Sequence, residues 1–160
     1  MALEQKQYRH ALGRFTTGVC VVSAVGEQGL PIGMTINSFS SLSLEPSLVQ
    51  WSIKQKSLCY PLFSRLKSYS ISVLSDQQME ISSRYARPGD HRMHPADYAI
   101  NEYGMPYVKH ALARFECLSW GRMEAGDHDL LIGIVDKFFA EPEGRPLVFF
   151  AGAYRPLLID

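Results

Sequence analysis

The sequence predicts a mainly β protein, an antiparallel barrel with two or three peripheral helices. About seven segments have the β-branched content or the polar–apolar alternation that is typical of strands. Because few helical segments separate these strands, hairpins join most of them, and a barrel is more economical than a doubly wound sheet. The 160 residues, 46% hydrophobic and 20% charged, suit one domain, residues 1–160, around one core.

The first half of the chain opens with an amphipathic helix. Tyr8, Leu12 and Phe15 share one helical face, together with Ala11, and Gly18 follows soon after as a stop signal. Predicted strands then cover residues 19–25, 31–37 and 48–53, with a turn at 26–29 and a serine-rich loop at 38–43. The first of these strands is almost continuously apolar, so we expect burial on both faces. A short helix follows, predicted by three leucines at helical spacing around Pro61: Leu58, Leu62 and Leu66.

The second half alternates strands with one helix and one long excursion. A strand at 69–74 precedes a helix that has Asp76 as its N-cap and carries Met79, Ile81 and Tyr85. Residues 87–107 hold three prolines, two glycines and two histidines with little periodicity, which predicts a surface excursion with a function or with mobility. The remaining predicted strands and turns are a strand from 113 to 123, a turn at 126–128, and strands at 129–139 and 147–150.

Charge and cysteine content exclude several classes of protein. Sixteen basic residues balance sixteen acidic ones, so no global positive field favours nucleic acid or an anionic membrane. No apolar run approaches the roughly 20 residues of a membrane span, and the start of the chain has no signal-peptide core, so we expect a cytoplasmic protein. The three cysteines lack CxxC spacing, which argues against a disulfide framework and a structural zinc site.

The densest polar cluster lies in residues 33–41. Thr35, Asn37, Ser38 and Ser41 offer uncharged donors and acceptors, and Gly33 would let a flat ligand approach the backbone. This combination fits a planar heterocycle with polar edges. The alternative is a serine-rich loop that satisfies its own backbone, and spacing alone does not decide between the two.

A second polar stretch follows the third predicted strand. Lys54, Lys56 and Ser57 could bind a phosphate through their ammonium groups, a hydroxyl and main-chain N–H groups. The alternative is a solvated turn. Neither GxxxxGK[ST] nor GxGxxG occurs, so a nucleotide would be bound without a Walker or Rossmann device.

Histidines supply the third group of candidates. His128, in the turn Gly126-Asp127-His128, could project into a cleft and stack on, or exchange a proton with, a ligand; the alternative is a surface histidine. Asp90, His91 and His94 could ligate a metal with that turn, but they lie in a segment without regular structure, so we expect no metal site. Neither GxSxG nor HExxH occurs, which disfavours hydrolases.

The order and spacing of several motifs together resemble one family. The chain resembles the flavin reductase family, the small reductase components of two-component flavin monooxygenases. The motifs that carry the resemblance are Ala11-Leu12-Gly13-Arg14-Phe15-Thr16-Thr17-Gly18-Val19, Gly33-Met34-Thr35-Ile36-Asn37-Ser38-Phe39-Ser40-Ser41, Ser43-Leu44-Glu45-Pro46, Glu124-Ala125-Gly126-Asp127-His128 and Gly152-Ala153-Tyr154-Arg155.

The resemblance implies a split β-barrel of the antiparallel Greek-key type, assembled as a homodimer that binds FMN or FAD near the subunit interface. It implies NADH or NADPH as the hydride donor and His128 on the nicotinamide side. The cofactor-binding residues that it implies are Met34, Thr35, Asn37 and Ser38 at the isoalloxazine and ribityl groups, Ser52, Lys56 and Ser57 near the phosphate or ribityl tail, Arg84 and Tyr85 at the far end of the flavin, and Tyr154 and Arg155 near the nicotinamide side.

The implied activity is hydride transfer from NAD(P)H to a flavin that then serves a separate monooxygenase. The cofactors carry this chemistry, which agrees with the lack of a catalytic triad. Two alternatives are an FMN-binding electron-transfer or storage protein without nicotinamide turnover, and an unliganded dimeric barrel. The stretch 54–58, Lys-Gln-Lys-Ser-Leu, departs from the Asp-x-x-Ser-Ser of many relatives, so we expect the phosphate to be held differently.

Overall fold

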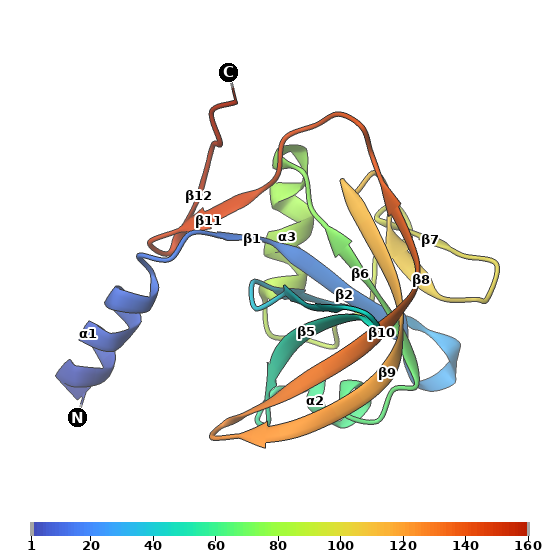
Figure 1. Cartoon of the computed structure of the whole chain (residues 1–160), viewed down its shortest axis with the longest axis horizontal. Helices are drawn as coiled ribbons and strands as arrows, with labels where there is room; N and C mark the ends of the chain where they lie inside the picture. Colours follow the sequence, from blue (N-terminus) through green and yellow to red (C-terminus); the bar gives the residue numbers. More distant parts are fainter. Residues whose placement is uncertain (1, 160) are drawn as a thin grey trace.

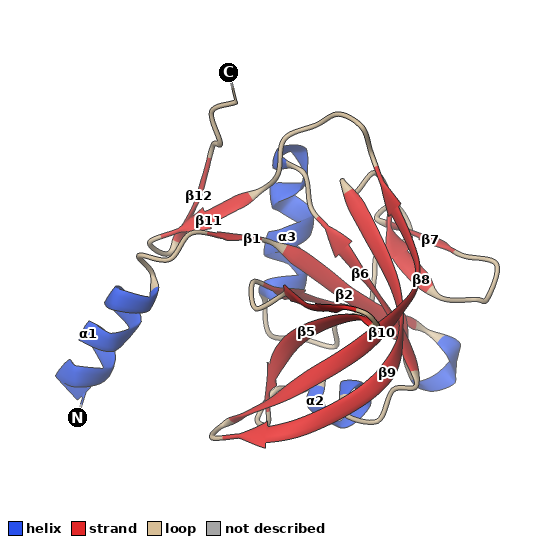
Figure 2. Cartoon of the chain, viewed as in Figure 1, coloured by secondary structure: helices blue, strands red, loops and turns tan. Residues whose placement is uncertain are grey.

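The computed structural model describes residues 2–159 and is dominated by one curled antiparallel sheet (Figure 2). Seven strands pair in the order β3-β2-β6-β9-β10-β5-β4. Their bounds are β2 (Cys20–Val25), β3 (Pro31–Ile36), β4 (Ser40–Leu44), β5 (Ser47–Lys54), β6 (Ser68–Val73), β9 (Ala113–Ala125) and β10 (His128–Ala140). The edge strands β3 and β4 are not paired with each other, so the barrel is split on that side. This architecture confirms the predicted mainly β, barrel-like fold.

A long hairpin forms one wall of the barrel. Strands β9 and β10 run antiparallel over nearly their whole length and also pair with β6 and β5 on either side. Their register shifts at two places, between Ile132 and Gly133 and between Val135 and Lys137. Such bulges bend and twist a strand. The bent hairpin therefore brings the beginning of β10 next to the end of β5 (Figure 1).

Two smaller sheets and three helices complete the fold. β1 (Thr17–Gly18), β11 (Val148–Phe150) and β12 (Ala153–Arg155) form one small sheet, and β7 (Tyr98–Ile100) pairs with β8 (Pro106–Val108). The helices are α1 (Ala2–Leu12), α2 (Tyr60–Phe63) and α3 (Met79–Ala86). Figure 1 shows α1 projecting away from the barrel, while α3 packs on it. None of the helices in residues 2–159 is long and apolar enough to cross a membrane.

Three sequence expectations in the first half need correction. The predicted loop at 38–43 contains the edge strand β4, where Ser40 pairs with Gln50, because an edge strand can keep its backbone paired while its hydroxyls face water. The first helix ends at Leu12, so Phe15 lies beyond it. The leucine-spaced helix is only the single turn of α2, since Ser68 already pairs in β6.

The second half differs from the prediction at the start of α3 and inside the excursion. A 3₁₀ turn, Asp76–Gln78, precedes α3, and Ser75 caps this turn in a capping box, in which its backbone N–H donates to Gln78 Oε1 over 3.0 Å. The N-cap of α3 itself is Gln78 rather than the predicted Asp76. The excursion at 87–107 contains β7 and the start of β8, which its proline content concealed.

The core has two parts on opposite faces of β2. Cys20, Val22 and Ala24 face the barrel interior with Trp51, whereas Val19 and Val21 face α3 and the excursion. Burial of this strand on both faces is thereby confirmed. The three cysteines, Cys20, Cys59 and Cys117, are free and buried.

Candidate functional site

A cavity of about 590 Å³ lies where the ends of β3 and β5 and the start of β10 face the C-terminal end of α3. We call it the polar cavity. Its volume is within the range of small-molecule and cofactor sites. Its lining consists of Met34, Thr35, Ile36, Asn37, Ser38, Ser52, Ile53, Lys54, Lys56, Ser57, Leu58, Tyr85, Ala86, Arg87, Pro88, His91 and His128. A neighbouring hollow of about 630 Å³ shares Leu58 with it but contains none of the predicted site residues.

The polar cavity brings together most of the residues that the sequence pointed to. Those that line it are Met34, Thr35, Asn37, Ser38, Ser52, Lys56, Ser57, Tyr85 and His128. Four predicted residues do not line it: Ser41, Arg84, Tyr154 and Arg155. The three stretches of sequence that were singled out separately, around residues 35, 56 and 128, thus form one site.

Strand pairing explains why these residues meet. Lys54 at the end of β5 lies opposite His128 at the start of β10. On the other side, the Ser38 hydroxyl bridges to β5: it accepts a hydrogen bond from the Ser52 backbone N–H at 3.0 Å and donates to the Ser52 carbonyl at 3.3 Å. The ends of β3, β5 and β10 thus form one part of the site, and the turn after β5 and the segment after α3 form the rest.

The fold itself uses two of the four hydrogen-bonding side chains predicted at residues 35–41. Thr35 Oγ1 donates to the Ser82 carbonyl of α3 over 2.7 Å, and Ser38 bridges to Ser52 as described. Asn37 is exposed at the cavity wall, whereas Ser41 lies on β4 outside the cavity. The backbone-satisfying interpretation therefore holds for Thr35 and Ser38, whereas ligand binding by Asn37 stays a prediction.

Gly33 has a different role from the one that the sequence suggested. A Cβ at this position would lie 3.1 Å from Met93 Cγ and 3.3 Å from Val21 Cγ1. The glycine thus allows close packing between β3 and the excursion, and the expectation that it admits a flat ligand was wrong.

All charged side chains on the cavity wall are basic. Lys54, Lys56 and Arg87 line it together with the imidazoles of His91 and His128, and no lining residue is acidic. Uncharged donors from Asn37 and the serines complete the set. Such a wall fits a ligand that combines a polar-edged ring with an anionic tail, which is the chemistry of a flavin nucleotide.

An exposed carboxylate orients His128. His128 Nδ1 lies 2.7 Å from Asp127 Oδ1. This hydrogen bond, more than the charge of the imidazole, holds the pKa of Asp127 below its usual range. A neutral imidazole that donates from Nδ1 keeps Nε2 as an acceptor. Asp127 thereby orients the His128 ring, whose Nδ1 faces the carboxylate.

His91, which the sequence suggested only as a metal ligand, lines the polar cavity. It lies on a segment of the excursion, residues 87–97, which we call the strap. Its carbonyl accepts the Gly33 N–H at 2.9 Å, and its Nδ1 lies 3.2 Å from the Gly33 carbonyl, so β3 holds it at the cavity. The signal was the triplet Gly89-Asp90-His91, which repeats the Gly-Asp-His of the later turn. Arg87 was also missed as a lining residue, whereas Lys54, a phosphate candidate in the sequence, lines the cavity.

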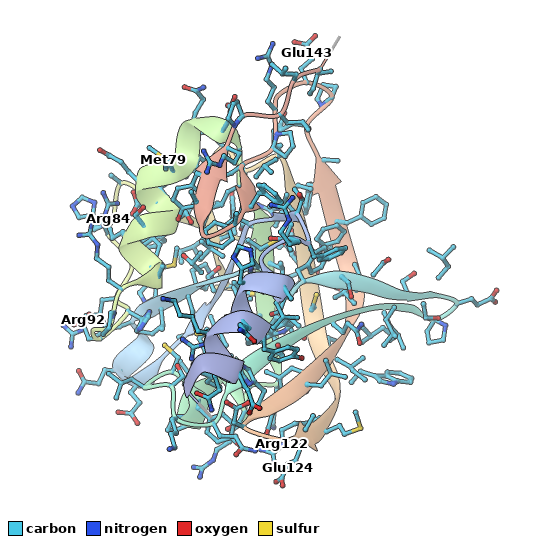
Figure 3. All side chains as sticks on the ribbon, turned by 90° about the vertical axis from the view of Figure 1, so that its left-hand side faces the viewer. Met79, Arg84, Arg92, Arg122, Glu124 and Glu143 are labelled. Atoms are coloured by element: carbon cyan, nitrogen blue, oxygen red, sulfur yellow. The ribbon has the colours of Figure 1, made fainter. Side chains whose placement is uncertain are left out.

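Arg84 and Tyr85 anchor the strap to α3. Arg84 projects from the outer side of α3 (Figure 3) and forms an ion pair with Asp97. The Tyr85 hydroxyl donates to Asp97 Oδ2 over 2.6 Å and accepts the His94 N–H at 2.8 Å. Tyr85 lines the polar cavity and Arg84 does not, and the placement of Tyr85 at the far end of the flavin stays a prediction.

The C-terminal candidates lie behind the cavity wall. Tyr154 forms a 2.6 Å hydrogen bond with Ser82 Oγ and lines a hollow of about 200 Å³ that borders Thr35 and Asn37 from the other side. Arg155 is exposed on β12. Within residues 2–159, no group of three or more His, Cys, Asp or Glu side chains is arranged to hold a metal ion.

Comparison with known proteins agrees with this geometry. A family model described as "Flavin reductase like domain" matches residues 12–158. The FMN reductase (NADH) SmoA of Agrobacterium fabrum is 44% identical over 149 residues, which cover 93% of this chain and 84% of that protein.

Two further matches extend the comparison. The reductase component of the flavin-dependent trigonelline monooxygenase of Acinetobacter baylyi is 37% identical over 93% of this chain; the match covers 48% of that relative, so this chain spans about half its length. The structure of the Streptomyces globisporus NADH:FAD oxidoreductase SgcE6 in complex with NAD and FAD fragments superposes with a TM-score of 0.92, at 30% identity, over 100% of this chain and 96% of that one. The chain belongs to the flavin reductase-like family.

Proposed function

We propose that this protein is an NAD(P)H-dependent flavin reductase that transfers a hydride to FMN or FAD and supplies the reduced flavin to a separate monooxygenase. The observation that carries the proposal is the wall of the polar cavity, which combines uncharged donors, three permanent cations and two imidazoles without an acidic side chain. Family membership supports it, as do the names of the relatives, one an FMN reductase (NADH) and another an NADH:FAD oxidoreductase.

A bound flavin would supply the redox chemistry by accepting the hydride of a nicotinamide. The residues of this chain bind and orient the two cofactors. Asn37 offers uncharged hydrogen bonds at the ring, while Lys54 and Lys56 neutralise the phosphate. His128, the cross-strand neighbour of Lys54, lines the same cavity, and we assign it to the nicotinamide.

We further propose that the chain, as a single domain over residues 1–160, assembles as a homodimer in the cytoplasm. α1 leaves Tyr8 67% exposed and Leu12 55% exposed, and Phe15 after it is 78% exposed. Apolar side chains on a projecting arm favour a second copy as their cover. Free thiols and a nicotinamide donor suit a reducing compartment. Sedimentation measures the assembly, and a monomer at micromolar concentration would contradict it.

The activity is tested by mixing the protein with FMN and then NADH under anaerobic conditions. We expect the visible absorbance of the flavin to bleach far faster than that of free FMN. Tight FMN binding without NADH turnover would instead identify an electron-transfer or storage protein, and no flavin binding would overturn the proposal.

A His128→Ala variant tests the nicotinamide assignment. We expect it to lose NADH-dependent turnover while it keeps most of its FMN affinity. The matched control is His110→Asn, which removes an exposed imidazole outside the polar cavity and keeps a residue that tolerates the positive φ of 58°. Unchanged NADH kinetics in His128→Ala would remove this residue from the mechanism.

A further inference from the structure

A buried carboxylate lies directly behind His128. Asp129, the next residue of β10, is 0% exposed. Gln55 Nε2 donates to its Oδ1 over 2.9 Å, and the Tyr60 hydroxyl donates to its Oδ2 over 2.8 Å. Arg122 Nε lies 3.4 Å from the same Oδ2. The hydrogen bond from Gln55, the largest influence, keeps the pKa of Asp129 below its usual range, against the effect of burial.

The three partners of Asp129 come from three different elements. Gln55 belongs to the turn after β5, Tyr60 begins α2, and Arg122 is near the end of β9, at the tip of the long hairpin (Figure 3). The carboxylate therefore ties together the segments that surround the beginning of β10.

The contact with Gln55 matters for the site because of the position of this residue in its turn. Lys54, Lys56 and Ser57 line the polar cavity, whereas the Gln55 side chain points behind the wall to Asp129. The turn has a second link to the start of β10, where the Gln55 N–H donates to the Asp127 carbonyl over 3.1 Å. Gln55 thus holds the 54–57 turn to the strand that carries His128 through its backbone and its side chain.

Packing alone does not explain a charge at this place. A buried carboxylate is expensive to desolvate, and an apolar side chain of similar size commonly stabilises a fold as well or better. Unlike an apolar side chain, a carboxylate makes directional hydrogen bonds, because its two oxygens hold two donors at fixed positions. A turn that presents cations to a ligand requires such a directional hydrogen bond to hold it in place.

We propose that Asp129 is a positioning residue: through Gln55 it fixes the 54–57 turn so that Lys54, Lys56 and Ser57 meet the phosphate of the flavin. The inference rests on the proposed function, since it takes a flavin nucleotide as the ligand.

The test compares FMN with riboflavin, which lacks only the phosphate, by fluorescence titration at equilibrium. The ratio of the two dissociation constants measures recognition of the phosphate alone. We expect Gln55→Ala to weaken FMN binding by about five- to tenfold, the change expected for one hydrogen bond, and to leave riboflavin binding within about twofold. A general loss of structure would weaken both ligands equally.

Gln50→Ala is the matched control. It removes a glutamine hydrogen bond of the same length, 2.9 Å to Ser40 Oγ, from β5, the strand before the turn, outside the polar cavity. We expect the FMN-to-riboflavin ratio of this variant to equal that of the wild type. An equal ratio in Gln55→Ala, or a wild type without preference for FMN, would overturn the inference. A wild type that binds neither flavin would overturn the proposed function instead.

A double-mutant cycle tests the role of Asp129 itself. Asp129→Ala should lower the ratio as Gln55→Ala does, and the double variant should show no further loss, because both changes remove the same link. Multiplied effects in the double variant would show that Gln55 acts without Asp129 and would overturn the assignment. If Asp129→Ala does not fold, the FMN-to-riboflavin ratios of Gln55→Ala and Gln50→Ala decide whether the inference stands.

Discussion

The hydrogen bonds that attach the strap to α3 determine how much the free energy of unfolding should fall in a Tyr85→Phe variant. Tyr85 is 1% exposed, and burial, followed by the hydrogen bond to Asp97, raises the pKa of its hydroxyl to about 12, so the group stays protonated in the neutral range. Tyr85→Phe removes a hydrogen bond to a buried carboxylate and another from the His94 N–H. Together these two losses lower the free energy of unfolding by about 3 kcal/mol.

For a chain of this length, such a loss lowers the melting temperature by roughly 6–12 °C. Thermal unfolding followed by circular dichroism at constant protein concentration measures it. The strap also carries His91, so we expect weaker FMN binding in the same variant.

Tyr103→Phe is the control for this variant. Tyr103 is 66% exposed, and its hydroxyl accepts a hydrogen bond from Lys137 Nζ at 3.1 Å on the surface. Its removal should change the free energy of unfolding by less than about 0.5 kcal/mol. If Tyr85→Phe melts as Tyr103→Phe does, the Tyr85–Asp97 contact does not hold the strap, and the reasoning fails.

Other predictions concern the barrel, alkaline stability and the cavity wall. A Cβ at Gly133 would lie 2.3 Å from Tyr69 Oη, so Gly133→Ala should lower thermal stability by about 1–3 kcal/mol, while Gly18→Ala, with nothing within 4 Å, should not. Burial raises the pKa of all three thiols to about 11 or 12 from 9.0; the free energy of unfolding measured in urea should therefore fall as the pH rises from 9 towards 12, and a rise would contradict this linkage. Asn37→Ala should weaken FMN binding, measured by titration, by about 1–3 kcal/mol, and wild-type affinity would place the ring elsewhere.

The strands of this fold were predictable because hydrophobic pattern and turn chemistry act locally. The apolar run of β2 indicated burial on both faces, and Gly126 marked the turn between β9 and β10. Edge strand β4 was not predicted, because serine-rich sequence on an edge resembles a loop. The length of α2 was overestimated, since the leucine spacing does not show that β6 begins at Ser68.

Residues that line the cavity directly were predictable from the sequence. Residues that depend on a contact with a distant part of the chain were less so. Asn37, Lys56 and His128 were identified and do line one cavity. Sequence spacing gave no indication that Arg84 pairs with Asp97, or that β3 holds His91 beside the cavity. These contacts depend on how the strap folds back, which no local pattern encodes.

The absence of acidic residues from the lining of the polar cavity has a consequence for the rate of cofactor capture. The formal charge of the whole chain is zero, yet Lys54, Lys56 and Arg87 converge on one opening. Oppositely charged ligands are steered only by such a local field, and added salt screens it beyond roughly 10 Å at 0.1 M. Anionic nucleotides should therefore associate faster in dilute buffer, whereas uncharged riboflavin should enter at the same speed in either.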